Sequence, residues 1–402
     1  MKFKLLTQLI LGIFLGLPLH LYAQVQKPNL PPSFTTAILK SNVVLPKIKL
    51  TKLNTDKLVA EDKSFPSPFR YAVHEKVQVN VRKSGLMTEL PNGRIWRYHI
   101  ETANAKSLQV HFEEFLLPKN AEVYIYDSHK KTVYGAFTNF NNKTFGGLTI
   151  ADFPSNECII EYFEPFEVEF EGDLIIGSIG KAYRDIMSTL NFKSSNEELK
   201  AVDINCPEGN DMQLEKHAIC RITFRDGLSS YLCSGAMLNN TESNGIPYFL
   251  TANHCISKDT VAQSVVAYFG YENYRCGNDS IVSPNNTISG AELLATRSVS
   301  DFSLLRLSET PNPSYKAYYA GWSLADTAPD KSYCIHHPSG DGKKISIELD
   351  SAISNPFQIN WEGEDLIPNQ RVSPANSHWQ VVFDIGRTET GSSGSPLFNE
   401  EN

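Results

Sequence analysis

The sequence FLTANHC occupies residues 249–255, where an apolar run typical of a β-strand ends in small residues that present a histidine beside a cysteine. Two further stretches are of similar interest. DFSLLRL at 301–307 places an aspartate at the start of an alternating apolar strand, and GSSGSPL at 391–397 surrounds serines with glycines that permit a sharp turn. Each stretch alone is common in structural turns and loops, so the information lies in their combination.

His254, Asp301 and Ser393 occur in the chain order His, Asp, Ser, which is the order of the chymotrypsin-type triad. A serine hydroxyl is a weak nucleophile at neutral pH and needs an adjacent base. We therefore expect His254 to take the proton of Ser393 and Asp301 to orient and stabilise the imidazole. The backbone N–H groups of Gly391 and Ser393 are expected to form an oxyanion hole.

The region around these stretches, from residue 206 onward, alternates short apolar runs with Gly, Asn, Ser and Pro loops and carries no long helical pattern, which favours an all-β fold. Six of the seven cysteines lie between residues 206 and 334, which suggests three bridges whose pairing the sequence leaves open. A zinc site is the alternative, but no CxxC pair or HExxH motif occurs, so no metal or other cofactor is expected.

Upstream, residues 64–190 contain short alternating runs separated by turn residues, a pattern typical of a β-sandwich. We expect residues 24–63, rich in Pro, Lys and Asn, to be a loose leader. The polar stretch 185–205 is predicted to be an exposed linker and a good site for proteolysis. The predicted domains are thus 64–200, sandwich and linker, and 201–402, the second β-unit.

Residues 1–23 begin with a positive Met-Lys-Phe-Lys segment, continue with a short apolar run and end in a small residue, Ala23, as a secretory signal peptide does. A membrane anchor is the alternative, but the run is short and Pro18 interrupts it. No later segment is apolar enough to span a bilayer, and export would permit disulfides. The 402 residues carry a net charge of −8 without a basic block, which argues against nucleic-acid binding.

Residues 201–402 resemble the lysyl endopeptidases, bacterial secreted serine peptidases with a trypsin-like double β-barrel. The resemblance implies that fold, with His254, Asp301 and Ser393 as the triad. It places Thr388 and Glu389 beside the primary specificity pocket. Trp361 is similar to a tryptophan that packs near the family's triad, but the match is loose and a core tryptophan is the favoured interpretation. The matching stretches are YFLTANHC (248–255), DFSLL (301–305), IHHPSGD (335–341), KIS (344–346) and TETGSSGSPL (388–397).

The resemblance also implies disulfides Cys233–Cys255 and Cys206–Cys276. These leave Cys220 and Cys334 as a third pair, and Cys158 as a free thiol or a precursor-only partner.

The chain departs from trypsin-like patterns at two places. Ser392 stands where trypsin-like zymogens carry an aspartate that pairs with the freed amino terminus, so activation should not depend on a buried terminal ammonium. The upstream domain is then expected to act by occlusion or by assisting folding. The chain also stops soon after Ser393, where the family has further strands, so we expect a second barrel that is incomplete at its C-terminus and lacks the residue that selects lysine.

Together these features predict a secreted serine endopeptidase made as a precursor, with residues 24–200 as propeptide. It would cleave proteins or peptides through an acyl-enzyme, after lysine, and could release itself at Lys200–Ala201. One alternative is a non-catalytic secreted binding protein with a degenerate barrel. Another is a serine peptidase of different specificity. A cysteine hydrolase using Cys255 is the least favoured, because that residue adjoins the expected base and has a bridge partner.

Overall fold

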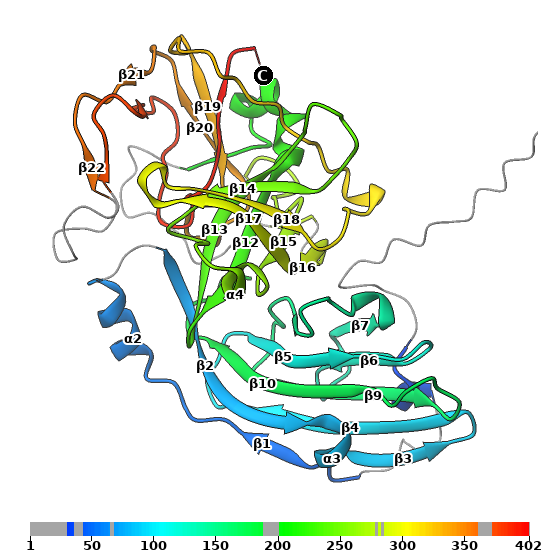
Figure 1. Ribbon diagram of the computed structural model, residues 1–402. Coiled ribbons are helices and arrows are strands. Elements are labelled where there is room, and N and C mark those ends of the chain that lie inside the picture. The colour runs from blue at the N-terminus through cyan, green and yellow to red at the C-terminus, as the bar shows by residue number, and fades with distance from the viewer. Residues whose placement is uncertain are drawn as a thin grey trace, which may run out of the picture.

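The computed structural model describes residues 30–35, 43–64, 68–187, 201–277, 280–282, 285–360 and 372–401. Figure 1 shows an N-terminal lobe and a C-terminal lobe, both built mainly of strands. The all-β fold class is thereby confirmed. The predicted signal peptide, most of the predicted linker and Trp361 lie outside the described residues. Within the described ranges, the model contains no helix with the length and apolar character needed to cross a membrane.

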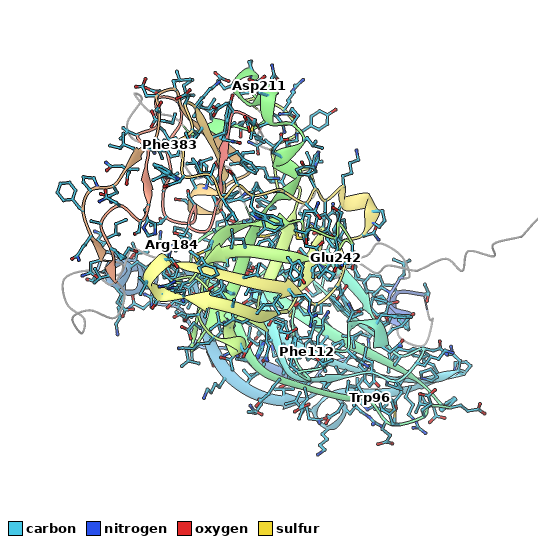
Figure 2. All side chains as sticks on the ribbon, turned by 45° about the horizontal axis from the view of Figure 1, so that its top comes forward. Trp96, Phe112, Arg184, Asp211, Glu242 and Phe383 are labelled. Carbon is cyan, nitrogen blue, oxygen red and sulfur yellow. A yellow bond between two sulfur atoms is a disulfide. The ribbon has the colours of Figure 1, made fainter. Side chains whose placement is uncertain are left out.

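The N-terminal lobe consists of two sheets packed face to face around one core. One sheet contains β1, β3, β4, β6, β7 and β9, and the strands β2, β5, β8 and β10 form the other. Phe112 and Ile160, which come from opposite sheets, are fully buried in the shared core (Figure 2 labels Phe112). The predicted β-sandwich is confirmed. The elements are α1 (Pro32–Thr35), β1 (Lys47–Lys49), α2 (Thr55–Asp62), β2 (Phe69–Asn80), α3 (Val81–Ser84), β3 (Leu86–Leu90), β4 (Gly93–Glu101), β5 (Leu108–Leu116), β6 (Glu122–Tyr126), β7 (Val133–Phe137), β8 (Leu148–Thr149), β9 (Glu157–Pro165) and β10 (Asp173–Ala182).

The expectation of a loose leader is wrong for residues 43–63. Strand β1 pairs in parallel with β4, and Leu50 and Leu53 are buried in the sandwich core. The Asn54 side chain caps helix α2 by accepting from the Lys57 backbone N–H at 3.1 Å. The segment shows little hydrophobic periodicity because only one short strand and two buried leucines hold it against the sandwich. Neither feature produces a repeating pattern in the sequence.

The first unit of the C-terminal lobe is a closed ring of strands. In order around the ring, β12, β13, β14, β18 and β17 are paired, and β16 and β15 lead back to β12. Only Gly290 separates β16 from β17, so these two strands close the ring around a core that includes Phe249 and Leu305. The elements are β12 (Ile219–Asp226), β13 (Ser229–Leu238), β14 (Tyr248–Ala252), α4 (Asp259–Ala262), β15 (Val266–Phe269), β16 (Thr287–Ser289), β17 (Ala291–Arg297) and β18 (Phe302–Leu307).

The second unit is a smaller sheet with the strand order β11-β20-β19-β25, accompanied by the pairs β21–β24 and β22–β23. Its core includes Ile335 and Ile345, which face each other across β19 and β20. The C-terminal lobe therefore has the two β-units of a trypsin-like fold. The elements are β11 (Val202–Asp203), β19 (Ser332–His336), β20 (Lys344–Glu348), β21 (Ile353–Ser354), β22 (Ile359–Asn360), β23 (Val372–Ser373), β24 (Trp379–Gln380) and β25 (Leu397–Asn399).

Strand β2 joins the two lobes into one continuous sheet. It pairs with β10 inside the sandwich and, near its start, with β13 of the first barrel, where Phe69 lies opposite Leu232. The resulting eleven-stranded sheet runs through both lobes (Figure 1). Tyr268 and Tyr271 of the C-terminal lobe lie in the same core as the sandwich residues. The sequence pattern gave no sign of this pairing, because alternation predicts a strand without naming its partners.

Candidate active site

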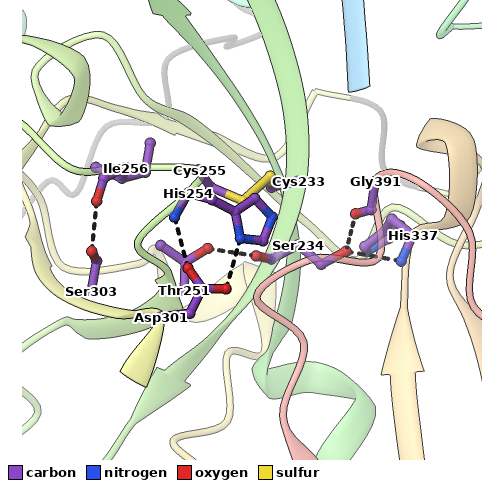
Figure 3. Close-up of a disulfide and its surroundings, with 10 residues drawn as sticks. All are labelled: Cys233, Ser234, Thr251, His254, Cys255, Ile256, Asp301, Ser303, His337 and Gly391. Atoms are coloured by element: carbon purple, nitrogen blue, oxygen red, sulfur yellow. Dashed lines mark hydrogen bonds and ion pairs between the residues drawn. A yellow bond between two sulfur atoms is a disulfide. The ribbon is translucent and has the colours of Figure 1, made fainter. Parts of the chain in front are cut away.

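Strands β14 and β18 bring His254 and Asp301 together. Ala252, the last residue of β14, lies opposite Phe302, the first residue of β18. Asp301 directly precedes β18 and His254 follows β14 by two residues, so the two side chains leave the same end of the paired strands. The His254 Nδ1 atom lies 2.7 Å from Asp301 Oδ2, and the His254 backbone N–H donates to Asp301 Oδ1 at 2.9 Å (Figure 3). Both carboxylate oxygens therefore hold the histidine, one through its ring and one through its backbone.

This arrangement decides which ring nitrogen of His254 is free to act. A carboxylate accepts hydrogen bonds, so the contact with Asp301 places the ring proton on Nδ1 and leaves a lone pair on Nε2. Nε2 is buried and has no hydrogen-bond partner in the part of the chain that the structure describes. A neutral imidazole with Nδ1 held by a carboxylate and Nε2 unoccupied is the form that a general base requires.

A disulfide restrains the histidine from the other side. Cys255 is bonded to Cys233 on β13, with Cα atoms 6.5 Å apart, and the bridge lies directly beside the His254 ring (Figure 3). The second implied bridge, Cys206–Cys276, is also present. Because Cys255 is oxidised, it cannot serve as a nucleophile, and the cysteine-hydrolase interpretation is wrong.

The third expected bridge is corrected by the structure, in which Cys220 and Cys334 are both free and buried. Cys220 belongs to the core of the first barrel, whereas Cys334 on β19 lies against the pocket described below. Burial raises the pKa of each thiol to about 12, so both behave as small apolar side chains. Cys158 is likewise a free thiol, in the sandwich core. An even cysteine count did not require that every cysteine be bridged.

The serine loop is anchored through its carbonyl groups. The Ser234 backbone N–H donates to the Ser393 carbonyl at 2.8 Å, and the Ser234 hydroxyl donates to the Gly391 carbonyl at 2.9 Å. The Ser339 backbone N–H donates to the Thr390 carbonyl at 2.6 Å. The N–H groups of Gly391 and Ser393, in contrast, donate to no acceptor among the residues that the structure describes. Two unpaired N–H groups on one turn are the elements of an oxyanion hole.

Gly391 has a backbone conformation that requires glycine. Its φ is +98°, and an added Cβ would lie 2.9 Å from the His337 carbonyl oxygen and 3.0 Å from the Ser339 nitrogen. Both contacts are to backbone atoms, which cannot move aside as a flexible side chain could. The sequence expectation that a side chain at Gly391 would disturb the loop therefore has a direct structural basis.

One pocket of about 500 Å³ brings most of the predicted site residues together. His254, Asp301, Ser393, Thr388 and Glu389 all line it, whereas Gly391 lies just behind it in the serine loop. The Ser393 hydroxyl is not hydrogen-bonded to His254 Nε2 in this structure. The pocket therefore contains the expected side chains, but the hydrogen bond expected between the Ser393 hydroxyl and His254 Nε2 is not formed in this structure.

The charge of Glu389 is already paired inside the protein. One of its carboxylate oxygens accepts from the Ser339 hydroxyl at 3.0 Å, and the other forms an ion pair with Arg387. A carboxylate with both oxygens occupied is a poor independent receptor for a substrate cation. Thr388 and Glu389 thus form the wall of the pocket.

Sequence reasoning missed the surroundings of Ser392. Its hydroxyl lies 2.8 Å from Nδ1 of His336, a fully buried histidine at the end of β19. His337 helps to hold the serine loop indirectly. Its backbone N–H donates to the Ser234 hydroxyl at 3.0 Å, and that hydroxyl donates to the Gly391 carbonyl. His378, from the segment before β24, also lines the pocket. Without the family resemblance, the only signal was a pair of histidines ending an alternating run, a pattern shared by many polar turns.

A family model and one curated relative identify the family to which the C-terminal lobe is similar. A family model described as lysyl endopeptidase, C-terminal domain, matches residues 197–402. The chain is 30% identical over 186 residues to a lysyl endopeptidase of Pseudomonas aeruginosa, covering 45% of this chain and 37% of that protein. It is 23% identical over 315 residues to secreted RxLR effector protein 73 of Plasmopara viticola, covering 75% of this chain and 74% of that one.

Among solved structures, a thermostable serine protease, AL20, from an extremophilic microorganism matches with a TM-score of 0.33 and 15% identity. The match covers 47% of this chain and 81% of that chain. A second structure, the protease Anisep from Arthrobacter nicotinovorans, matches with a TM-score of 0.29 and 15% identity, over 46% and 78% of the two chains.

Two β-units that carry a histidine–aspartate pair and a glycine-bordered serine loop around one pocket define the class of trypsin-like serine peptidases. Within that class, the chain belongs to the lysyl endopeptidase family, whose C-terminal domain model spans half of it. The chain spans little more than a third of the length of the Pseudomonas aeruginosa relative.

Proposed function

We propose that the protein is a secreted serine endopeptidase, made as a precursor, that cleaves peptide bonds through an acyl-enzyme on Ser393. The observation that carries this proposal is the orientation of His254. Its Nδ1 is held by Asp301, and its Nε2 has no partner among the described residues and lies beside a pocket that also contains Ser393. Secretion is supported by the signal-peptide pattern of residues 1–23 and by the two disulfides.

In the proposed reaction, Ser393 Oγ attacks the scissile carbonyl carbon while His254 Nε2 takes the hydroxyl proton. Asp301 stabilises the imidazolium that forms. The oxyanion of the tetrahedral intermediate accepts hydrogen bonds from the Gly391 and Ser393 N–H groups. The C–N bond then breaks as His254 gives its proton to the leaving amine, and a water molecule, activated by the same histidine, releases the acyl group.

We further propose cleavage after lysine, on the basis of family membership. Thr388 and Glu389 would contact the substrate side chain as part of the pocket wall. Because the Glu389 charge is paired with Arg387, we assign it a role in shaping the pocket and not the role of the anion that selects lysine.

Residues 24–200 are proposed to be the propeptide, released by cleavage at Lys200–Ala201. All residues that line the catalytic pocket lie between Leu250 and Pro396, so none of the described N-terminal lobe lines it. The pairing of β2 with β13 supports the other possible role, assistance in folding the first barrel. We therefore favour a folding template over an occluding lid.

The proposal is tested with a fluorophosphonate probe, which reacts only with an activated serine. The full-length protein that the gene encodes should be labelled on Ser393, and Ser393→Ala should abolish labelling. Ser314→Ala, at an exposed turn away from the pocket, is the matched control and should label normally. A folded wild-type protein that takes no label would favour the non-catalytic binding protein.

A further inference from the structure

Ser392 occupies the position that carries an aspartate in trypsin-like zymogens, and the structure provides it with a buried partner. The His336 ring lies between two hydroxyl groups, with Nδ1 2.8 Å from Ser392 Oγ and Nε2 3.0 Å from Ser346 Oγ. His336 is 0% exposed and Ser392 is 8% exposed. Both ring nitrogens therefore have partners inside the protein, and His336 does not itself line the pocket that Ser392 lines.

The hydrogen-bond donors in this chain can be assigned from their partners. Ser392 Oγ accepts the Glu389 backbone N–H at 3.1 Å, which leaves the Ser392 hydroxyl hydrogen to point at His336 Nδ1. The ring then carries its single proton on Nε2 and donates it to Ser346 Oγ. Burial lowers the pKa of His336 to about 3, so the ring stays neutral over the working range of a secreted enzyme. The chain Ser392–His336–Ser346 contains no formal charge.

The location of Ser392 makes this contact relevant to the oxyanion hole. It lies between Gly391 and Ser393, whose N–H groups donate to no acceptor among the described residues and are the proposed oxyanion-hole donors. Between Gly391 and Gly394, the Ser392 hydroxyl is the only side-chain group with hydrogen-bond partners in the part of the chain that the structure describes. The remaining anchors act on backbone carbonyls, through Ser234 and Ser339. Rotation of the Ser392 peptide is thus opposed by two bonds of the side chain, to His336 and to the Glu389 N–H, beside the local backbone bonds of the turn.

We propose that His336 is a positioning residue that fixes Ser392 and thereby presets the oxyanion-hole loop, replacing an ion pair to a freed amino terminus. The inference rests on the proposed function of Ser393 as nucleophile. It implies that the loop is already assembled in the precursor, because every group that holds it, His336, Ser346, Ser234 and Ser339, belongs to the same folded lobe. Cleavage of the linker would then separate the lobes without rebuilding the oxyanion hole.

Two amide substitutions distinguish the two hydrogen bonds that the His336 ring makes. In His336→Asn, the amide can occupy the place of Nδ1 and keep the bond to Ser392. In His336→Gln, it can occupy the place of Nε2 and keep only the bond to Ser346. Both variants bury one amide in place of one imidazole. His217→Asn, on a half-buried histidine remote from the pocket, is the matched control.

In the full-length protein, we expect His336→Gln to lower kcat by about a hundredfold, the scale of losing one oxyanion-hole donor, with KM within about threefold of wild type. His336→Asn should lose about tenfold or less, the scale of one imperfect neutral hydrogen bond. Equal kcat values in the two variants, or a loss expressed mainly in KM, would overturn the proposal.

If both amide variants fail to fold, Ser392→Ala removes only the hydroxyl, and with it the same bond to His336, and should lower kcat by about a hundredfold as His336→Gln does. A Ser392→Ala enzyme with wild-type kcat would contradict a positioning role. A readout independent of turnover is the NMR signal of the Gly391 and Ser393 amides, which should move or broaden in Ser392→Ala and in His336→Gln but not in His217→Asn. This separates the two claims: an unlabelled wild type would refute the proposed function, whereas unchanged amide signals would refute the role of His336.

Discussion

The carboxylate of Asp301 has a double task that neither a backbone carbonyl nor an amide could perform. It accepts from the His254 backbone at 2.9 Å and from the ring at 2.7 Å, which fixes both the position and the tautomer of the base. Asp301 itself adopts a left-handed conformation with φ of +48°, at the end of a short turn of 3₁₀ helix. The pairing of β14 with β18 brings His254 and Asp301 close together, and the turn before β18 orients the Asp301 side chain toward His254.

Asp301→Asn should therefore lower kcat by about 10⁴-fold with little change in KM. The amide can present its NH₂ group to Nδ1, which would stabilise the tautomer with the proton on Nε2 and remove the base. The measurement is steady-state hydrolysis of a lysyl amide substrate. Asp326→Asn, at an exposed position, serves as the control. An Asp301→Asn enzyme within tenfold of wild type would show that Asp301 does not set the tautomer.

Sequence reasoning found residues that the structure brings to one pocket, and it missed the residues that hold them in place. His254, Asp301 and Ser393 stood out because each lies in a distinctive local pattern, and the structure brings them to one pocket. The contact of Ser392 with His336 spans 56 residues of chain and involves two residue types that are common in turns. No local pattern reports such a contact, because the two partners meet only after β19 pairs with β25.

At the scale of elements, the active site depends on how the strands of the first barrel are tied. Strand β13 contributes Cys233 to the disulfide and Ser234 as a donor to the serine loop, so one strand connects the segment of His254 with the loop of Ser393. The strands themselves were predictable from alternation and turn residues. The free state of Cys220 and Cys334 was not predictable, because free cysteines suit a buried apolar site as well as bridged ones do.

Replacing Cys233 and Cys255 together with serine should lower the free energy of unfolding by about 3 kcal/mol, given a loop of 22 residues. It should also lower kcat, because the backbone beside His254 is no longer restrained. Denaturant unfolding and steady-state kinetics on the same preparation provide both numbers. An unchanged midpoint under oxidising conditions would indicate that the bridge contributes little to stability.

Two histidines of the N-terminal lobe, the buried His74 on β2 and the half-buried His111 on β5, contact the first barrel. His74 lies between Ser178 and Ser230, with ring contacts of 3.1 and 2.7 Å, and His111 contacts Arg225 at 3.1 Å. Burial, with the Arg225 charge as a further cause, lowers the pKa of each histidine to about 3. Both residues link the N-terminal lobe to the first barrel, so their protonation affects the contact between the lobes.

Because these pKa values are lower in the folded than in the unfolded protein, the unfolded state binds more protons below about pH 6.5. The stability that the histidines contribute is present above that pH and is lost as pH falls toward 3. At pH 5, each histidine accounts for a loss of about 2 kcal/mol. Asp152, whose pKa is raised to about 6 by burial, opposes this trend as a single group.

The thermal midpoint of the precursor should therefore fall between pH 7 and pH 5. The fall should be smaller in His74→Gln, which keeps a polar side chain between β2 and β13 but has no group that takes up a proton in this pH range. His129→Gln, at an exposed position, is the control and should follow wild type. A midpoint that rises over this range, or an unchanged fall in His74→Gln, would show that the buried histidine does not govern the acid response.

On the scale of the whole molecule, the two lobes share one sheet and part of one core. Arg221 of the C-terminal lobe is fully buried and donates to the Ile186 carbonyl at 2.7 Å and to the Gly340 carbonyl at 3.1 Å. Its guanidinium also lies 3.6 Å from the ring centroid of Tyr271. Two separate domains joined by a linker were expected from the sequence. The continuous sheet could not be foreseen, because composition and alternation carry no information on long-range pairing.

This interface predicts that the C-terminal lobe folds poorly by itself. Expressed from residue 201 onward, it would leave the β13 edge unpaired and Tyr268 and Tyr271 without part of their core. We expect a yield of active enzyme at least about tenfold lower, with residues 24–200 supplied as a separate chain restoring it. Full activity without any N-terminal lobe would contradict the folding-template role.

The central claim, that Ser393 is the nucleophile of a lysine-directed endopeptidase, is tested most directly by mapping cleavage positions. Denatured proteins are digested with the full-length, processed protein and with its Ser393→Ala twin, and the cuts are identified by mass spectrometry. We predict cuts that follow lysine and are absent with the twin. No cuts from a folded and processed sample, or the same cuts from the twin, would contradict the account.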